Sequence, residues 1–205
     1  MTSEPVNIFE YTTDDISISE KEYKRYMGVG NGKADTGLER MIDECRAELC
    51  RVIKIRGCYR LCDVDASDEN GVNLGFIHPD SRDLSKNLRV CRRAVVFAVT
   101  IGVEADRLIS KYNAISPSRA VAADAVASAA VEAATERLCA DLKIKYGNMR
   151  PRFSPGYGDF PLSYQPYICE FLDCGRKAGI RLTESFMLVP VKTTTAIAGI
   201  ISDDL

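Results

Sequence analysis

The stretch Ala94-Val-Val-Phe-Ala-Val-Thr-Ile-Gly102 is a continuous apolar run with the length of one β-strand. A strand that is apolar on both faces is typical of the middle of a sheet, where other elements cover it on both sides. We therefore predict that this stretch is the central strand of the fold.

Other β-prone stretches surround it. Residues 6–17 are rich in β-branched side chains and predict a strand that ends at Asp14-Asp15. Residues 52–58, 61–64 and 72–76 predict short strands separated by polar turns, with Asn70-Gly71 as a hairpin signal. Residues 180–190 and 193–200 predict two more strands near the end of the sequence.

Helices are expected between and after these strands, at residues 19–27, 36–53, 103–112, 118–146 and 163–178. Grouped strands with intervening helices favour an α+β fold: a single domain with a mainly antiparallel, twisted sheet flanked by helices. The helix at 118–146 has a first half made almost entirely of small residues, which permit close backbone approach. Asp124 and Glu132 stand there eight residues apart on one face, and each faces either solvent or a specific partner.

Composition narrows the function. The 205 residues carry a net charge of −2, which argues against nucleic-acid binding. No apolar run approaches the ~18 residues of a membrane span. The beginning, Met-Thr-Ser-Glu-Pro, lacks the features of a secretory signal, so we expect no membrane partner and a cytoplasmic location.

The sequence has eight cysteines and a single histidine, His78. No two of the cysteines form a C-x2-C pair. We expect reduced and mostly buried thiols in place of a zinc site or a disulfide framework. The glycine-rich segment 28–32 follows a predicted helix and not a strand, so a dinucleotide-binding loop is not favoured.

The segment Arg152-Phe-Ser-Pro-Gly-Tyr-Gly-Asp-Phe160, followed by Pro161, predicts a tight turn at Pro155-Gly156. Such a loop lets backbone groups approach a ligand closely, with Arg152 and Tyr157 beside them. From its residues alone it is either a ligand-binding loop or an ordinary connection.

This loop, the helix from Tyr167 and Leu182-Thr-Glu-Ser-Phe186 together resemble the S-adenosylmethionine-binding activation domain of cobalamin-dependent methionine synthase. Ala130-Val-Glu-Ala-Ala134, Val99-Thr-Ile-Gly102 and Arg25-Tyr-Met-Gly28 extend the resemblance. It covers roughly residues 95–200 and is looser before them. It implies that residues 91–205 form an S-adenosylmethionine-binding core and that residues 1–90 add helices and a hairpin to the same domain.

The resemblance also implies a function. Domains of this family support the reductive methylation of inactive cob(II)alamin: a flavodoxin- or ferredoxin-type donor supplies an electron, and S-adenosylmethionine supplies the methyl group. Nothing in the sequence resembles the Asp-x-His-x-x-Gly motif of a cobalamin module. The expected partner is therefore a separate methionine synthase or other corrinoid protein, which carries the cobalamin.

Residue by residue, the resemblance implies that Arg152 pairs with the methionine carboxylate and Glu132 with the α-amino group or a ribose hydroxyl. Backbone groups of Ser154, Pro155 and Gly156 would hold adenine or ribose, Tyr157 would lie towards the corrin, and Asp124 is a further candidate. No catalytic residue or metal ligand is implied. The structural alternatives are a salt bridge from Arg152 to Glu132 or Asp159, and a packed Tyr157.

Two other functions remain open. One is a non-catalytic interaction subunit that has lost the ligand, and the other is an unrelated small-molecule methyltransferase, which is disfavoured because no glycine-rich loop follows a first strand. The family's full-length members continue with an aromatic pair that touches the ligand, whereas the given sequence ends at Leu205. We therefore expect weak binding of S-adenosylmethionine, or binding completed by a partner chain.

Overall fold

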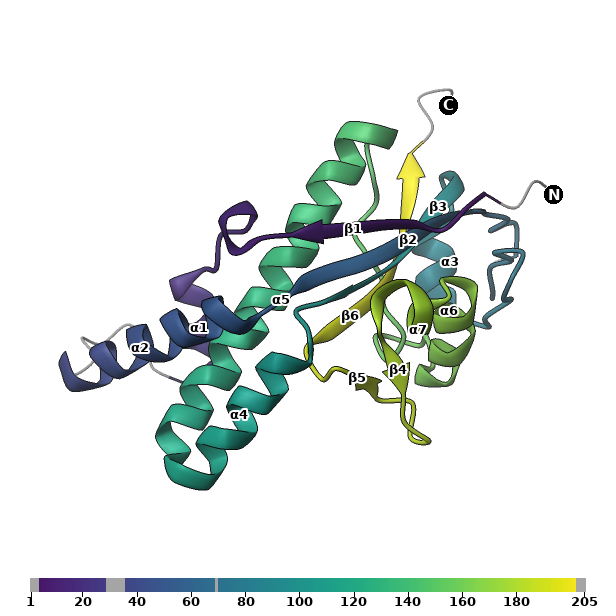
Figure 1. Ribbon diagram of the computed structural model, residues 1–205. Helices are drawn as coiled ribbons and strands as arrows, with labels where there is room; N and C mark the ends of the chain where they lie inside the picture. The colour runs from purple at the N-terminus through teal and green to yellow at the C-terminus, as the bar shows by residue number, and fades with distance from the viewer. Residues whose placement is uncertain (1–3, 29–35, 69, 202–205) are drawn as a thin grey trace.

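A four-stranded antiparallel sheet with helices on both faces forms the protein (Figure 1). This computed structural model describes residues 4–28, 36–68 and 70–201. The strands lie in the order β1-β2-β3-β6, with the bounds Asn7–Tyr11, Ile55–Asp63, Cys91–Thr100 and Thr193–Ile201. The predicted α+β architecture is confirmed. Residues 29–32 of the glycine-rich segment lie outside the described residues.

Strand β3 is the central strand that the apolar run predicted. It pairs with β2 on one side and β6 on the other, and its side chains alternate between two hydrophobic clusters. Val95, Phe97 and Val99 belong to one cluster, and Ala94, Val96 and Ala98 belong to the other. All six side chains are fully buried, because both faces of the sheet are covered.

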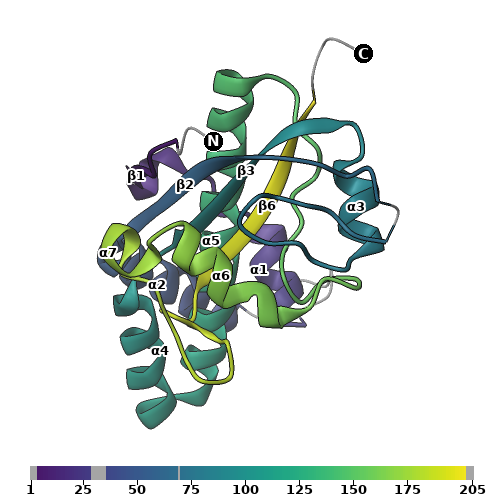
Figure 2. The same cartoon turned by 90° about the vertical axis from the view of Figure 1, so that its right-hand side faces the viewer.

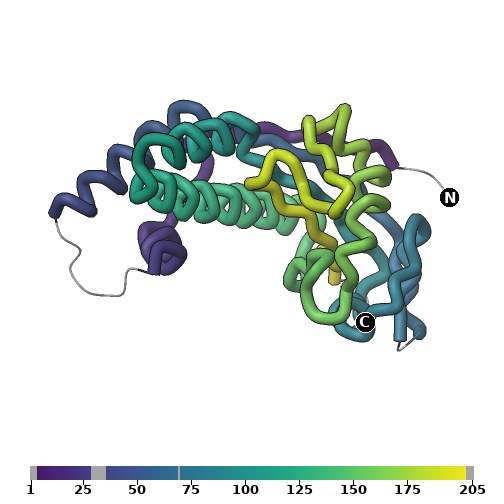
Figure 3. The backbone as a smooth tube through the Cα atoms, turned by 90° about the horizontal axis from the view of Figure 1, so that it is seen from below, coloured from purple at the N-terminus to yellow at the C-terminus, as the bar shows by residue number. Residues whose placement is uncertain are grey.

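The first face is covered by the long helix α5, Pro117–Tyr146, together with α2, Thr36–Val52, and α4, Val103–Ile115. Figure 3 shows α5, in green, running beside α4, in teal. The buried alanines of α5 let its backbone come close to the strands. Helix α1, Glu20–Tyr26, packs against α5, and Ser19 accepts a hydrogen bond from the backbone N–H of Glu22 as its N-cap.

The second face is covered by three short helices, α3 (Arg82–Leu88), α6 (Gln165–Phe171) and α7 (Cys174–Ala178) (Figure 2). A two-stranded hairpin of β4, Arg181–Leu182, and β5, Leu188–Val189, continues from α7. These elements enclose the second hydrophobic cluster, so the molecule has a helix–sheet–helix arrangement.

The strands predicted between residues 52 and 76 are wrong in detail. Residues 55–63 form one strand, β2, because residues 56–63 pair without interruption with β3; the Arg60 side chain donates to the carbonyls of Glu4 at 2.8 Å and Phe171 at 3.2 Å. Residues 72–76 form no strand, and only an isolated bridge joins Asp65 to Asn73. Near the beginning, β1 ends at Tyr11, and a 3-10 turn, Thr13–Asp15, follows it.

The single helix predicted at residues 163–178 is broken. A 3-10 turn, Leu162–Tyr164, leads into α6, and Asp173 then adopts a left-handed conformation with φ +50° before α7 begins. Asp tolerates this conformation better than most residues. The break changes the direction of the chain, so that both helices bury apolar side chains against the sheet.

The strand predicted at residues 180–190 is also wrong, because it folds back on itself. Thr183 and Met187 close the turn between β4 and β5: the Thr183 N–H donates to the Met187 carbonyl at 2.9 Å, and the Met187 N–H donates to Thr183 Oγ1 at 3.1 Å. A threonine hydroxyl that binds nearby backbone competes with an extended strand. Phe186 takes a left-handed φ of +63° within this turn.

Candidate functional site

The loop from Arg152 lies along the free edge of β6. Phe153 and Ile197 exchange two backbone hydrogen bonds of 2.8 Å, and the Arg150 N–H donates to the Gly199 carbonyl at 2.8 Å. Pro151, which lies between these residues, has no N–H to donate, and none of the three hydrogen bonds needs one from it. The sheet edge therefore fixes the position of Arg152.

The predicted turn at Pro155-Gly156 is present. The Tyr157 N–H donates to the Ser154 carbonyl at 3.2 Å, and Gly156 has φ +90°. A positive φ at this third turn position is the conformation for which glycine is preferred. The Gly156 N–H also donates to the Phe160 carbonyl at 2.8 Å, which closes the loop on itself.

Two residues anchor the exit of the loop. Phe160 is buried in the second cluster. The Asp159 carboxylate accepts hydrogen bonds from the Ser81 hydroxyl and from the backbone N–H groups of Arg82 and Asp83, at the beginning of α3. The Ser81 hydroxyl, followed by these N–H groups, lowers the pKa of Asp159 from its ordinary value. The Asp159 carboxylate is therefore hydrogen-bonded to the beginning of α3 and is not the partner of Arg152.

Arg152 forms an ion pair with Glu132 of α5. The two side chains are 29% and 31% exposed, so water reaches both of them. This contact joins the loop to the middle of the long helix across the edge of the sheet. Of the two structural alternatives for Arg152, the salt bridge to Glu132 is therefore the one present. The sequence analysis had already placed both of these residues in the candidate site.

A cleft of about 840 Å³ opens around this ion pair. Its lining includes five of the seven residues predicted for the site: Glu132, Arg152, Ser154, Pro155 and Tyr157. The lining joins α5 and the loop to Gln165 of α6 and to residues 193–195 of β6. The volume lies in the range of small-molecule pockets.

The other two predicted residues do not line the cleft. The backbone of Gly156 shapes the turn behind the lining. The Asp124 carboxylate pairs with Lys192 Nζ at 2.8 Å, and Lys192 also donates to Ser128 Oγ at 3.0 Å. Asp124 therefore binds a lysine two turns of α5 away from Glu132.

Sequence reasoning missed the part of the cleft that α1 contributes. Glu22, Arg25 and Tyr26 all line it. Arg25 pairs with Glu22 at 3.2 Å, and its guanidinium lies 5.0 Å from the centre of the Tyr26 ring. The family resemblance had included Arg25-Tyr-Met-Gly28 without giving it a role at the site, and the packing of α1 on α5 is what brings these side chains to the cleft.

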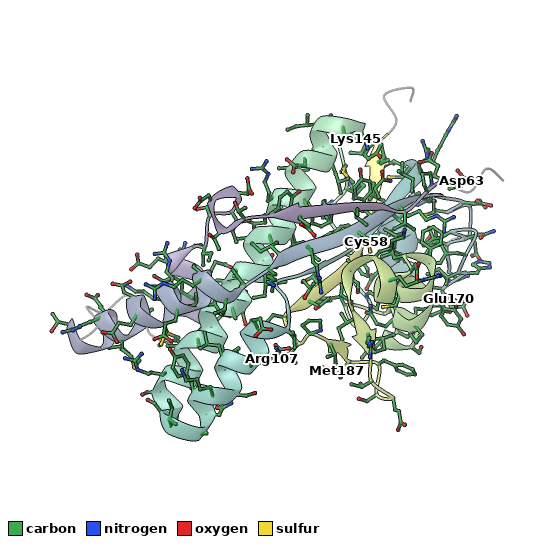
Figure 4. The ribbon with its side chains drawn as sticks, viewed as in Figure 1. Cys58, Asp63, Arg107, Lys145, Glu170 and Met187 are labelled. Carbon is green, nitrogen blue, oxygen red and sulfur yellow. The ribbon has the colours of Figure 1, made fainter. Side chains whose placement is uncertain are left out.

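Glu136 was also missed, although a signal existed. It is four residues after Glu132, so both carboxylates lie on the same face of α5, and both line the cleft. The wall opposite comes from residues 186–188 of the β4–β5 hairpin and from Val191. Met187 projects from this hairpin in Figure 4, and its side chain is 56% exposed.

The cysteines were expected to be mostly buried. All eight are free thiols in the structure, five of them buried and three half-buried, in agreement with the expected burial. Among the described residues, no cluster of three histidine, cysteine or acidic side chains suited to a metal ion is found. Within the same residues, no helix is both long and apolar enough to span a membrane.

Fold and cleft together define an α+β domain with a ligand-sized site at one edge of its sheet. A crystal structure of the MetH reactivation domain bound to AdoHcy has this fold: the TM-score is 0.72, and the match covers 100% of this chain and 81% of that one. The sequence identity is 16%, so the similarity shows the fold. No protein-family model matches the sequence, and a search of curated proteins finds no match. The predicted activation-domain fold is thereby confirmed.

Proposed function

We propose that the protein binds S-adenosylmethionine in the cleft and supports the reductive methylation of cob(II)alamin on a separate corrinoid protein, such as a cobalamin-dependent methionine synthase. One observation carries the proposal: the cleft unites the Arg152–Tyr157 loop with Glu132, in the fold of a reactivation domain whose crystal structure contains AdoHcy. AdoHcy is S-adenosylmethionine without the methyl group that is transferred.

The chemistry of the lining suits this ligand. S-adenosylmethionine carries a carboxylate, an ammonium group and a sulfonium, so it needs both positive and negative partners. Arg152 offers a guanidinium to the carboxylate, a charge-assisted contact, and Glu132 offers a carboxylate to the ammonium group or a ribose hydroxyl. Polar backbone at residues 154–156 is available to adenine or ribose.

The proposed reaction balances with one electron and one methyl group. A flavodoxin- or ferredoxin-type donor reduces cob(II)alamin to cob(I)alamin. The electron pair of cob(I) then forms the cobalt–carbon bond while the carbon–sulfur bond breaks towards sulfur, which yields methylcobalamin and S-adenosylhomocysteine. No proton moves in this transfer, so the protein's task is to hold the methyl group in line with cobalt.

The rim of the cleft suits a partner that closes it. Tyr157, Phe186 and Met187 are 70%, 39% and 56% exposed, and all three line the same opening. Exposed aromatic and methionine side chains are typical of protein interfaces. A corrinoid protein that covers this rim would bring its cobalt to the cleft and exclude water from the transfer.

A non-catalytic interaction subunit is the second candidate, and a specific observation favours it. Glu132 already occupies Arg152, the group proposed to bind the ligand carboxylate. If that ion pair persists in every state, the same fold caps a corrinoid protein without binding S-adenosylmethionine.

Calorimetric titration separates the two candidates. We expect heat of binding with S-adenosylmethionine and with S-adenosylhomocysteine, and no heat with adenosine at the same concentration. The second step mixes the protein with cob(II) methionine synthase and a reductant and follows methylcobalamin by absorbance, with a known activation domain as positive control. Absence of both binding and thermal shift at millimolar ligand would favour the interaction subunit. Binding of S-adenosylmethionine without formation of methylcobalamin would contradict only the reactivation role.

A further inference from the structure

The β5–β6 connection, residues 190–192, forms one wall of the cleft together with the first residues of β6. Val191 and Thr193 line the cleft, whereas Lys192 between them does not. Figure 1 shows this connection leading from the β4–β5 hairpin towards α4. The connection has no regular secondary structure, so contacts from other elements must hold its shape.

The Lys192 side chain reaches α5. It is only 12% exposed, and its Nζ pairs with Asp124 Oδ1 at 2.8 Å and donates to Ser128 Oγ at 3.0 Å. An ammonium group so far removed from water is costly unless it is both paired and hydrogen-bonded, and here it is both. Asp124 is 53% exposed, so water still reaches this carboxylate. The ammonium group is therefore the member of the pair that depends on its partner.

The backbone of the connection is held by two other elements. The Val191 N–H donates to Asp106 Oδ2 of α4 at 2.8 Å. The Lys192 carbonyl accepts from the Ile101 N–H at 3.2 Å and from Thr100 Oγ1 at 3.3 Å, where β3 ends. Two consecutive residues of the connection are thus bound by α4, by the end of β3 and by α5.

This arrangement gives Asp124 a different place from the one that the resemblance implied. Asp124 was a candidate ligand contact, yet it does not line the cleft, and its carboxylate binds Lys192. Lys192 in turn stands between two residues that do line the cleft, Val191 and Thr193. Any influence of Asp124 on a ligand must therefore pass through Lys192 and the wall of the cleft.

We propose that Lys192 is a positioning residue of the ligand site. Paired with Asp124, it holds Val191 and Thr193 in the arrangement that binds S-adenosylmethionine. A wall that is ordered before the ligand arrives lowers the conformational entropy lost on binding, so it increases affinity without touching the ligand. This inference rests on the proposed function, because it names a determinant of affinity at the same cleft.

The test is titration calorimetry with S-adenosylmethionine on Lys192→Met. Methionine keeps the apolar stem of the side chain and removes the ammonium group, and the half-exposed Asp124 carboxylate is left to water. We expect the dissociation constant to rise about tenfold or more, because displaced binding groups lose affinity steeply. Lys192→Arg keeps the positive charge and should retain most of the affinity. All titrations are made well below the unfolding temperatures of the variants, so that every sample is folded.

Arg119→Met is the matched control. Arg119 also joins α5 to a neighbouring element, since it pairs with Glu44 of α2, and neither of these residues lines the cleft. This variant should lose stability as Lys192→Met does, measured by urea denaturation, but bind S-adenosylmethionine like the unsubstituted chain. The proposal is overturned if folded Lys192→Met binds within about twofold of the unsubstituted chain. It is also overturned if Arg119→Met weakens binding as much as Lys192→Met does.

A second measurement needs no ligand. Hydrogen exchange followed by NMR reports how often the backbone N–H groups of Val191 and Thr193 open to water. Lys192→Met should speed exchange at these two positions about tenfold, whereas Arg119→Met should not. Unchanged exchange in Lys192→Met would overturn the proposal by itself. If the unsubstituted chain does not bind S-adenosylmethionine, the proposed function fails, and exchange still decides whether Lys192 holds this wall.

Discussion

Replacing Arg152 with alanine should weaken S-adenosylmethionine binding without unfolding the protein. The Arg152–Glu132 ion pair is about one-third exposed on each side, and exposed pairs contribute at most about 1 kcal/mol to stability. A hydrogen bond from Arg152 to the ligand carboxylate contributes about 1.5–3 kcal/mol to binding. The dissociation constant should therefore rise about 10- to 150-fold, while the free energy of unfolding changes by about 1 kcal/mol or less.

The assay is titration calorimetry on Arg152→Ala, with urea denaturation of the same samples. Arg107→Ala is the matched control, because Arg107 lies on α4, pairs with Glu104 at 2.6 Å and is 69% exposed. That variant should bind like the unsubstituted chain. The reasoning is refuted if the unsubstituted chain binds the ligand and Arg152→Ala binds it within about twofold of the same affinity.

Glu132→Gln tests which role the carboxylate plays. If Glu132 contacts the ligand ammonium group, this variant should also lose affinity, by about tenfold or more. If Glu132 only competes for Arg152, affinity should stay the same or increase, because the guanidinium is released. The double variant then completes a thermodynamic cycle, in which non-additive losses report that the two side chains act on one ligand together.

Three further predictions concern the rim, the loop anchor and the core. Tyr157→Ala should slow methylcobalamin formation about tenfold while changing S-adenosylmethionine affinity far less, because Tyr157 is 70% exposed at the rim; equal losses in both assays would contradict a partner-facing role. The pKa of Asp159 is lowered by the Ser81 hydroxyl, so its contribution to stability is present above the unfolded-state pKa of about 3.9 and is lost as pH falls through the lower folded-state value. Asp159→Asn should therefore reduce the loss of stability in that acid range, measured by urea denaturation at several pH values, and an unchanged pH profile would contradict the anchor. Ala130→Leu should destabilise the protein by about 1–3 kcal/mol, because Ala130 is fully buried where α5 approaches the sheet; an unchanged denaturation midpoint would disprove that close packing.

Some elements could be predicted because their signals are local. The apolar run at residues 94–102 specified a strand buried on both faces, and the alanine-rich stretch specified a long helix in close contact with its neighbours. The turn at Pro155-Gly156 followed from the preferred φ values of two adjacent residues. Each of these signals needs only residues that are close in sequence.

The errors occurred where distant contacts outweighed local signals. Two separate strands were expected at 52–58 and 61–64, yet β2 runs unbroken because its residues 56–63 pair with β3, a strand about forty positions later. The helix expected at 163–178 breaks at Asp173, which takes a left-handed conformation, and α7 then packs against β2 and β3. The error at residues 180–190 was of the other kind, a local signal that was overlooked: Thr183 binds the backbone of Met187, four residues later, and so closes a hairpin.

For the candidate site, the sequence by itself determined the chemical groups: a guanidinium, a tight turn and a carboxylate on a long helix, in Arg152, Pro155-Gly156 and Glu132. Only the tertiary structure decided that the edge of β6 sets Arg152 against Glu132, and that α1 and the β4–β5 hairpin complete the cleft. The physical reason is that turn chemistry and helical periodicity act between neighbours in the chain, whereas a cleft is made by packing between segments far apart in it.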